Sequence, residues 1–170
     1  MTRVNGFTLL ELILTLSVLM IVLTIGTPAL SQWVQKSKAT DLQYKLLHSI
    51  HYARTKATQL QSTVTLCPGI SICENNWGEG LLIFNDSNNN GSYESNETLL
   101  KTVDLGLLGE NLDWRSFRRK PYLQFNSQGL TKALNGSFHF CPSTSIDELK
   151  FSIILARTGR TRVSDNTNCL

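Results

Sequence analysis

The chain has 170 residues and a formal net charge of +3 at pH 7, which predicts one folded domain with short appendages. Hydrophobic residues make up 41% and charged residues 17% of the sequence, and this composition excludes a wholly disordered chain. The excess of positive charge is too small to indicate an anionic partner. The places where basic residues gather therefore matter more than their total.

The N-terminal segment is long and apolar. Residues 1–6 are polar, and from Phe7 to Leu30 the only charged side chain is that of Glu11. As a helix this stretch would extend over roughly 36 Å, which is enough to cross a hydrocarbon core of about 30 Å. A secretory signal would have a shorter apolar stretch and would end at small residues. A carboxylate inside such a segment is energetically costly and usually functional.

The run Gly6-Phe7-Thr8-Leu9-Leu10-Glu11-Leu12 resembles the processing site of type IV prepilins. The resemblance implies that residues 1–6 are a leader, that prepilin peptidase cuts after Gly6, and that it methylates Phe7. It also implies that Glu11 pairs with the N-terminal amine of a neighbouring subunit, because a buried carboxylate needs a partner. The implied location is the bacterial inner membrane, with a single pass and a periplasmic head, before incorporation into a pilus at the cell surface. A generic signal anchor is the alternative.

We expect a hydrophobic transmembrane and assembly helix over residues 7–35 and a globular head over residues 36–170. In the head, apolar residues recur at spacings of three and four, which predicts an amphipathic helix over residues 36–61 with one face on a core. The predicted buried stripe is Leu42, Leu46, Ile50, Ala53, Ala57 and Leu60. Gly26 and Pro28 fall where pilin helices commonly bend or melt.

The rest of the head, residues 62–170, has short β-branched and aromatic runs separated by turn signals, which predicts an α+β fold. The expected strands are Ser62–Cys67, Gly80–Asn85, Glu97–Val103, Tyr122–Asn126, Ser137–Cys141, Leu149–Ala156 and Arg160–Val163. Residues 104–121 follow no recognisable pattern.

This half resembles the FimT/GspH group of minor pilins and pseudopilins. The resemblance is carried by residues 77–86, 88–91, Glu97, 125–129, 136–141 and 153–160. It implies a type IV pilin fold, in which one long N-terminal helix packs on antiparallel sheets.

The segment Gly159-Arg160-Thr161-Arg162 is the strongest functional signal. On an extended strand the two arginines point to the same side, about 7 Å apart, and guanidinium groups bind phosphate oxygens. In FimT-like minor pilins of naturally transformable bacteria, a GRxR motif at this place is associated with DNA binding. The resemblance therefore implies a DNA site at Arg160 and Arg162, with Gly159 allowing the turn. A solvated hairpin edge, protected by charge from aggregation, is the alternative.

A second basic cluster lies between Asp113 and Pro121. Cations with interleaved aromatic residues suit backbone contact combined with stacking on bases. Trp114 and Phe117 would alternatively be core anchors of a surface loop. The candidate secondary DNA-binding residues are Arg115, Arg118, Arg119 and Lys120, together with Lys150 and Arg157 if their side chains face the same way.

The loop from Asp86 to Glu97 fits the spacing of a calcium-binding loop, with Asn88 and Asn90 as further ligands. Its flanks read as strands, so a β-hairpin with a long polar loop is the favoured interpretation and no metal is expected. The sequence has no nucleophile elbow, Walker loop or zincin motif. Nothing in it supports catalysis or a cofactor.

The four cysteines, Cys67, Cys73, Cys141 and Cys169, fit two disulfides in an oxidising compartment. Three pairings are open. Local closure favours Cys67 with Cys73, which leaves Cys141 for Cys169. Alternatively, Cys169 pairs elsewhere or stays free.

Together these features predict a minor type IV pilin that binds double-stranded DNA without sequence preference and contributes to DNA uptake in natural transformation. Other major and minor pilins would be its partners in the fibre. The alternative is a structural subunit without a nucleic-acid role, either a minor pseudopilin of type II secretion or a minor pilin that primes assembly. An adhesin at the pilus tip is a third class.

Overall fold

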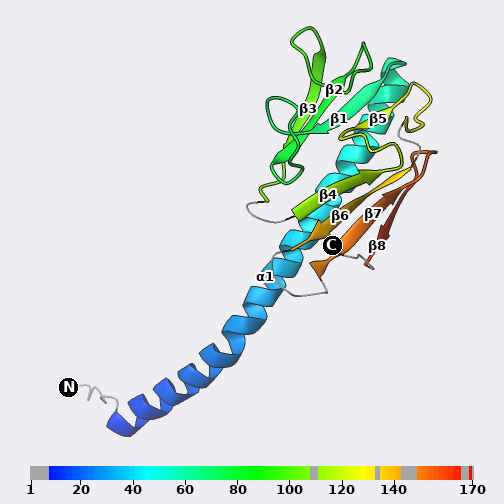
Figure 1. The fold of residues 1–170 in the computed structure, drawn as a ribbon. Helices are drawn as coiled ribbons and strands as arrows, with labels where there is room; N and C mark the ends of the chain where they lie inside the picture. Colours follow the sequence, from blue (N-terminus) through cyan, green and yellow to red (C-terminus); the bar gives the residue numbers. More distant parts are fainter. Residues whose placement is uncertain (1–7, 108–110, 133–134, 143–148, 166–168, 170) are drawn as a thin grey trace. The chain divides into compact units, whose positions relative to one another are not determined.

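The structure is a computed structural model, which describes residues 8–107, 111–132, 135–142, 149–165 and 169 (Figure 1). The chain divides into two compact units, residues 1–38 and residues 39–170. One helix, α1 (Leu9–Leu60), contributes to both. Each unit is described by itself.

In the first unit, α1 begins after Thr8, whose side-chain oxygen accepts a hydrogen bond from the backbone N–H of Glu11 at 3.3 Å. This is the helix-capping role expected of threonine, and Glu11 is the acidic residue of the first turn. The apolar side chains that follow are exposed. By length and composition the helix is able to cross a membrane, with a mean hydropathy of 2.5 over its most apolar window.

Of the two expected effects of Gly26 and Pro28, a bend or a melted turn, the structure shows no melted turn, because α1 continues through Pro28. A proline inside a helix removes one backbone hydrogen bond. The neighbouring hydroxyls of Thr24 and Thr27 donate to backbone carbonyls of the preceding turn at 2.9 and 3.0 Å. These bonds satisfy the two hydroxyl groups within the apolar part of the helix.

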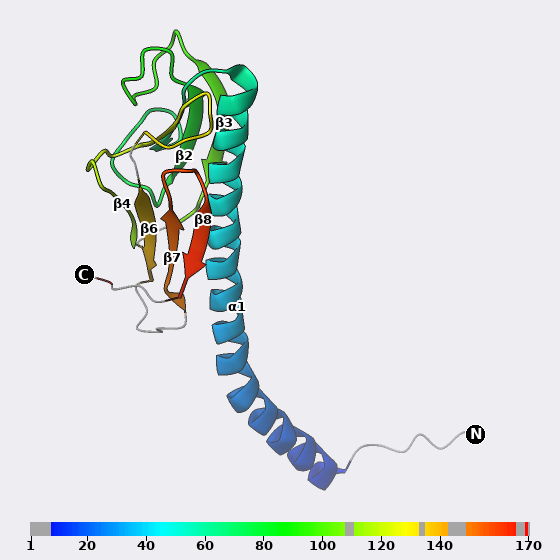
Figure 2. The same ribbon diagram turned by 90° about the vertical axis from the view of Figure 1, so that its right-hand side faces the viewer.

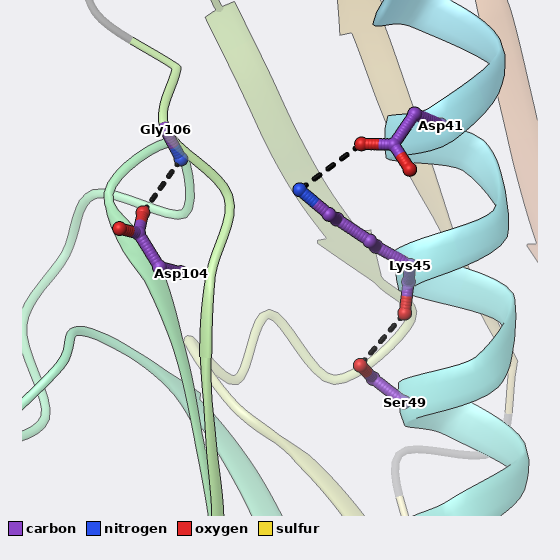
Figure 3. Close-up of polar contacts among 5 residues, drawn as sticks. All are labelled: Asp41, Lys45, Ser49, Asp104 and Gly106. Carbon is purple, nitrogen blue, oxygen red and sulfur yellow. Dashed lines mark hydrogen bonds and ion pairs between the residues drawn. The ribbon is translucent and has the colours of Figure 1, made fainter.

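In the second unit, five of the six predicted stripe residues are buried, from Leu42 to Ala57. The prediction is wrong for Leu60, which is the last residue of the helix and is 45% exposed. On this part of α1, Lys45 pairs with Asp41 at 3.0 Å, and its carbonyl accepts from the buried Ser49 hydroxyl at 2.7 Å (Figure 3). The buried hydroxyl is therefore satisfied.

Two four-stranded antiparallel sheets pack along residues 39–60 of α1 (Figures 1 and 2). Sheet A has the order β3-β2-β1-β5 and sheet B the order β4-β6-β7-β8. The strands of sheet A are β1 (Val64–Pro68), β2 (Gly80–Asn85), β3 (Thr98–Asp104) and β5 (Leu123–Phe125). The strands of sheet B are β4 (Asn111–Ser116), β6 (Gly136–Cys141), β7 (Phe151–Leu155) and β8 (Thr161–Ser164). This is the predicted α+β arrangement.

All the predicted strands are present with ends that differ by one or two residues at most, but β4 was missed. It lies in the segment 104–121 that had no recognisable pattern. Leu112 and Trp114 do alternate with Asp113 and Arg115, yet only two apolar residues mark the buried side. Because β4 is an edge strand of sheet B, charged residues are favourable on its other face.

The core of the head is made entirely by residues from Leu42 onward. Two disulfides reinforce it, Cys67 to Cys73 and Cys141 to Cys169. The first is the pair that local closure favours and the second is the pair that it leaves, so both predictions are confirmed. Since the core, the strands and both disulfides lie in the second unit, residues 37–170 contain everything needed to fold without the apolar segment.

Candidate nucleic-acid interface

The GRTR segment forms the turn and second strand of the β7–β8 hairpin. The N–H of Ala156 donates to the carbonyl of Arg160 and the N–H of Gly159 donates to the carbonyl of Ala156, both at 2.9 Å. Gly159 has φ of +76°, so the three residues between this pair form a turn that ends in the left-handed region. A side chain at Gly159 would be strained there.

Strand alternation sends the two arginines to the solvent side of sheet B. Val163 pairs with the buried Ile153 and packs against the core, whereas Arg162 pairs with Ile154 on the opposite face. Arg160 lies two residues before Arg162 and therefore on the same side, about 7 Å away. Both arginines are exposed. Within the described part of the chain, no ion pair engages either guanidinium group.

A row of paired residues connects Arg162 to the second basic cluster. Arg162 pairs with Ile154, Ile154 with Ser137 and Ser137 with Arg115. Directly paired residues share a face of a sheet, so Arg115 and Arg162 lie on the same side, about 14 Å apart across three strand spacings. Arg115 also contacts Asp113 at 3.7 Å in an exposed ion pair, which holds it only weakly.

The remaining cations of the second cluster follow β4 in a turn. The N–H of Arg119 donates to the carbonyl of Ser116, and the N–H of Lys120 donates to the Ser116 hydroxyl. Arg118, Arg119 and Lys120 are exposed. Ser116 pairs with Gly136, which pairs with Leu155 just before the β7–β8 turn.

The two basic clusters thus meet at one end of sheet B, where β4 and β7 end and where β6 and β8 begin. We call it the basic end. Its cations are Arg115, Arg118, Arg119, Lys120, Arg157, Arg160 and Arg162. The sequence has no acidic residue from Trp114 to Ile146 or from Leu149 to Ser164. The acidic residue of β4 is Asp113, which forms the ion pair with Arg115.

The two aromatic residues of the cluster have different roles. The ring centre of Trp114 lies 4.6 Å from that of Phe138 and 6.3 Å from that of Trp77, so Trp114 is the core anchor of the alternative interpretation. Phe117 is 74% exposed. The anchor interpretation is therefore wrong for Phe117, which leaves its ring available for stacking.

Arg157 and Lys150 differ in their positions. The exposed Arg157 lies in the β7–β8 turn, and its carbonyl accepts a hydrogen bond from the N–H of Thr131 at 2.9 Å. Arg157 is therefore part of the basic end. Lys150 is half-buried, directly precedes β7 at the opposite end of the strand, and does not belong to it.

Two helix residues that the sequence did not reveal hold the hairpin. Arg54 donates to the carbonyl of Gly129 through Nε at 3.2 Å and to that of Gly159 at 3.4 Å. The Nε2 atom of His51 lies 3.2 Å from the Thr161 hydroxyl. Thr161 thus faces α1 while its two neighbours face solvent. No sequence signal marks Arg54, because its partners lie 75 and 105 residues further along the chain.

His139 lies on the outer face of sheet B, beside two charged residues of β4. It pairs with Asp113 across the strands, and its ring lies 2.7 Å from the Ser137 hydroxyl. Burial lowers the pKa of His139 below 6.5, and the positive charge of Arg115 lowers it further, against a smaller opposing effect of Asp113. The ring therefore favours its neutral form.

The loop between Asp86 and Glu97 connects β2 to β3, as the hairpin interpretation predicted. The carboxylate of Asp86 is fully buried and accepts hydrogen bonds from Thr65, Gln124, and the backbone of residues 90 and 91. Glu97 accepts from two backbone N–H groups of the same loop. Among the described residues, no group of three or more His, Cys, Asp or Glu side chains is placed to hold a metal.

The predicted cleavage and methylation residues, Gly6 and Phe7, lie outside the described residues. Glu11 is described and lies in the first turn of α1. Its predicted partner is a neighbouring subunit, so its assembly role stays a prediction.

Two family profiles match the chain. The profile described as "Type II transport protein GspH" matches residues 45–159, and the one described as "Prokaryotic N-terminal methylation motif" matches residues 1–27. No curated protein matches the chain.

Solved structures resemble it in fold. The type IV minor pilin FimU of Pseudomonas aeruginosa is 19% identical with a TM-score of 0.56, over 79% of this chain and 90% of that one. The minor pseudopilin EpsH from the Type 2 Secretion System of Vibrio cholerae is 14% identical with a TM-score of 0.51, over 74% and 94%. At these identities the likeness shows the fold, which is that of type IV pilins.

Proposed function

Since the chain belongs to the GspH family of minor pilins and pseudopilins, we propose that it is a minor type IV pilin whose head binds double-stranded DNA. Arg160 and Arg162 are the primary contacts, and the other cations of the basic end are secondary ones. The subunit would contribute to DNA uptake in natural transformation. No catalytic step is involved.

The observation that carries this proposal is the arrangement of Arg160 and Arg162. Both guanidinium groups are exposed on one side of a strand whose other side is packed on the core. A well-anchored backbone beneath two free guanidinium groups lowers the ordering cost of binding. Arginine offers planar, bidentate donors to phosphate oxygens.

Binding to phosphates predicts two properties of the affinity for DNA. Affinity is independent of sequence, because phosphate contacts carry no base information. It also falls steeply with salt, because each neutralised phosphate releases counterions. With few contacts the dissociation constant of one head would be on the order of 10⁻⁴ to 10⁻⁶ M at physiological salt. Several subunits in one pilus would raise the overall affinity for DNA through avidity.

The N-terminal unit would deliver the head to the fibre. We propose that the leader of residues 1–6 is removed after Gly6, that Phe7 is methylated, and that Glu11 pairs with a neighbouring subunit during assembly. Before assembly, the apolar part of α1 would hold the subunit in the inner membrane. Prepilin peptidase and other pilins are the partners that this proposal requires.

The test is an electrophoretic mobility shift with residues 37–170 and a duplex of random sequence. Arg160→Ala/Arg162→Ala is expected to weaken binding at least about tenfold, since each lost bond to a charged group is worth more than a neutral one. The matched control is Lys56→Ala/Lys101→Ala, which removes the same charge from two lysines packed over the Tyr52 ring. Equal affinity of wild type and the arginine variant would overturn the site assignment.

A second candidate is favoured by the family description and by the likeness to EpsH. As a pseudopilin of type II secretion, the subunit would assemble without binding nucleic acid. Deletion would then impair secretion and leave transformation intact. Loss of transformation with normal secretion would support the first proposal instead.

A further inference from the structure

A small cavity lies beside the basic end, where the turn after β4 meets sheet A. It has a volume of about 230 Å³ and is lined by Asn89, Arg118, Lys120, Tyr122, Gln124 and Lys132. Half of these side chains are cationic and none is acidic. Lys132 and Asn89 come from loops that the sequence did not connect with DNA binding.

The lysines of the cavity are held in place by neighbours. The ammonium group of Lys120 lies over the ring of Tyr122, 5.8 Å from its centre. The same ring packs on Gly91, where an added Cβ would lie 2.1 Å from a ring carbon. The ammonium group of Lys132 donates to the side-chain oxygen of Asn89. These contacts lower the entropy that a ligand would otherwise have to remove.

The nearest described carboxylate bonded to a lining residue of the cavity is that of Asp86. Gln124 lines the cavity and donates through Nε2 to Asp86 at 2.6 Å. The remaining bonds to Asp86 come from the Thr65 hydroxyl and two backbone N–H groups. Its charge is thus bonded by neutral donors, and Asp86 itself does not line the cavity.

The cavity is close to the β7–β8 turn. The N–H of Lys132 donates to the carbonyl of Gln124, and the N–H of the preceding residue, Thr131, donates to the carbonyl of Arg157. From the usual spacing of bonded strands and consecutive Cα atoms, the Cα atoms of Lys132 and Arg157 lie within roughly 9 Å of each other. Arg118 reaches the cavity from the turn that begins at Ser116.

We propose that this cavity binds one phosphate group, and that in the proposed function this phosphate belongs to the duplex held by Arg160 and Arg162. Its volume is below the range of about 300 to 1,000 Å³ typical of sites for drug-sized ligands, so it fits a single anionic group. Two ammonium groups and a guanidinium group around that space favour a multiply bonded oxyanion. The assignment of this phosphate to the duplex rests on the proposed function. The phosphate site itself does not.

The experiment follows the backbone amides of residues 37–170 by NMR during two titrations, one with inorganic phosphate and one with a random duplex. Both are expected to shift the amides of Lys120, Tyr122 and Lys132. In Lys120→Ala/Lys132→Ala these shifts should disappear with inorganic phosphate. DNA affinity should fall about eightfold at 0.1 M salt, with the slope of log K against log salt reduced by about 0.9, the value of one phosphate contact.

The control Lys56→Ala/Lys101→Ala also removes two lysines. Lys101 lies on β3, at the edge of sheet A opposite β5. The control should leave the phosphate-induced shifts unchanged. Absence of cavity shifts with both titrants would overturn the proposal. Shifts with inorganic phosphate in a head that binds no DNA would keep the phosphate site and overturn the proposed function. Normal DNA binding by the Lys120→Ala/Lys132→Ala variant would overturn the assignment of the phosphate to DNA.

Discussion

Two polar segments of the head, the Asp86–Glu97 loop and the β7–β8 turn, both matched functional motifs in the sequence but are built in opposite ways. In the loop, the Asp86 carboxylate is fully buried and is bonded by side chains and backbone of the head. In the turn, the backbone is tied down by Arg54 and by hairpin bonds, while Arg160 and Arg162 extend into solvent.

The difference lies in where the hydrogen-bonding capacity of each motif is used. The carboxylate oxygens of Asp86 are bonded by the loop backbone and by the side chains of Thr65 and Gln124, so the charge of the loop stabilises the fold. The turn is held by backbone carbonyls and by a residue outside the motif, so its guanidinium donors stay available to a partner. The hydrogen bonds that the charged atoms of a motif already make are thus a better guide to its role than its residue pattern.

Removing the Asp86 carboxylate should have the largest effect on stability. Asp86→Ala leaves several buried donors unpaired, and each costs about 1 to 3 kcal/mol. We expect the free energy of unfolding to fall by about 3 to 5 kcal/mol in urea titrations. Asp113→Ala, on the exposed face, should cost under about 1 kcal/mol. A loss in stability below about 1 kcal/mol for Asp86→Ala, as in the control, would mean that the loop carboxylate does not stabilise the fold.

Replacing the turn glycine, Gly159, should have the second-largest effect on stability. In Gly159→Ala, the new Cβ would lie 2.7 Å from the carbonyl oxygen of Gly129 at a φ of +76°. We expect a loss of about 2 kcal/mol in stability and weaker DNA binding in the same preparation. Gly106→Ala is the matched control, because φ is +64° there but the Cβ would meet only one atom, at 3.9 Å. Equal losses in the two variants would show that packing around the turn is unimportant.

Arg54→Ala should separate positioning from contact. Losing its two bonds is expected to cost about 1 kcal/mol of stability and to weaken DNA binding about threefold, because the turn is held less firmly. The slope of log affinity against log salt should not change, since Arg54 touches no phosphate. Arg160→Ala, by contrast, should reduce that slope. A reduced slope in Arg54→Ala would place Arg54 in the interface itself.

The smallest expected effect is on pH dependence. The folded state holds the pKa of His139 below the value of 6.5 that applies when the chain is unfolded. Its contribution to stability is therefore present above about pH 6.5 and is lost as the pH falls through the lower, folded-state pKa. The free energy of unfolding of the His139→Gln variant should depend less on pH in this range than that of the His48→Gln variant.

Bound DNA should raise the pKa of His139, because phosphate favours the charged ring. An NMR titration that shows no rise would place the DNA elsewhere.

Much of the fold follows from local sequence patterns. The buried helix stripe and the β7–β8 turn glycine could be predicted from the sequence, because the periodicity of a helix and the conformation of glycine are local properties. Strand β4 was not readable, since two apolar residues among charges give a weak signal. Two long-range features leave no mark in the sequence, because tertiary packing alone creates them: the bond from Arg54 to Gly159 and the joint position of Lys120 and Lys132 at one cavity.

The most direct test of the central claim is the salt dependence of DNA binding by residues 37–170. If Arg160 and Arg162 bind phosphates, log affinity should fall linearly with log salt, and Arg160→Ala/Arg162→Ala should reduce the slope by about 1.8, the value of two phosphate contacts. The same variant should keep the wild-type melting temperature, because both side chains are exposed. An unchanged slope in a folded variant would contradict the account.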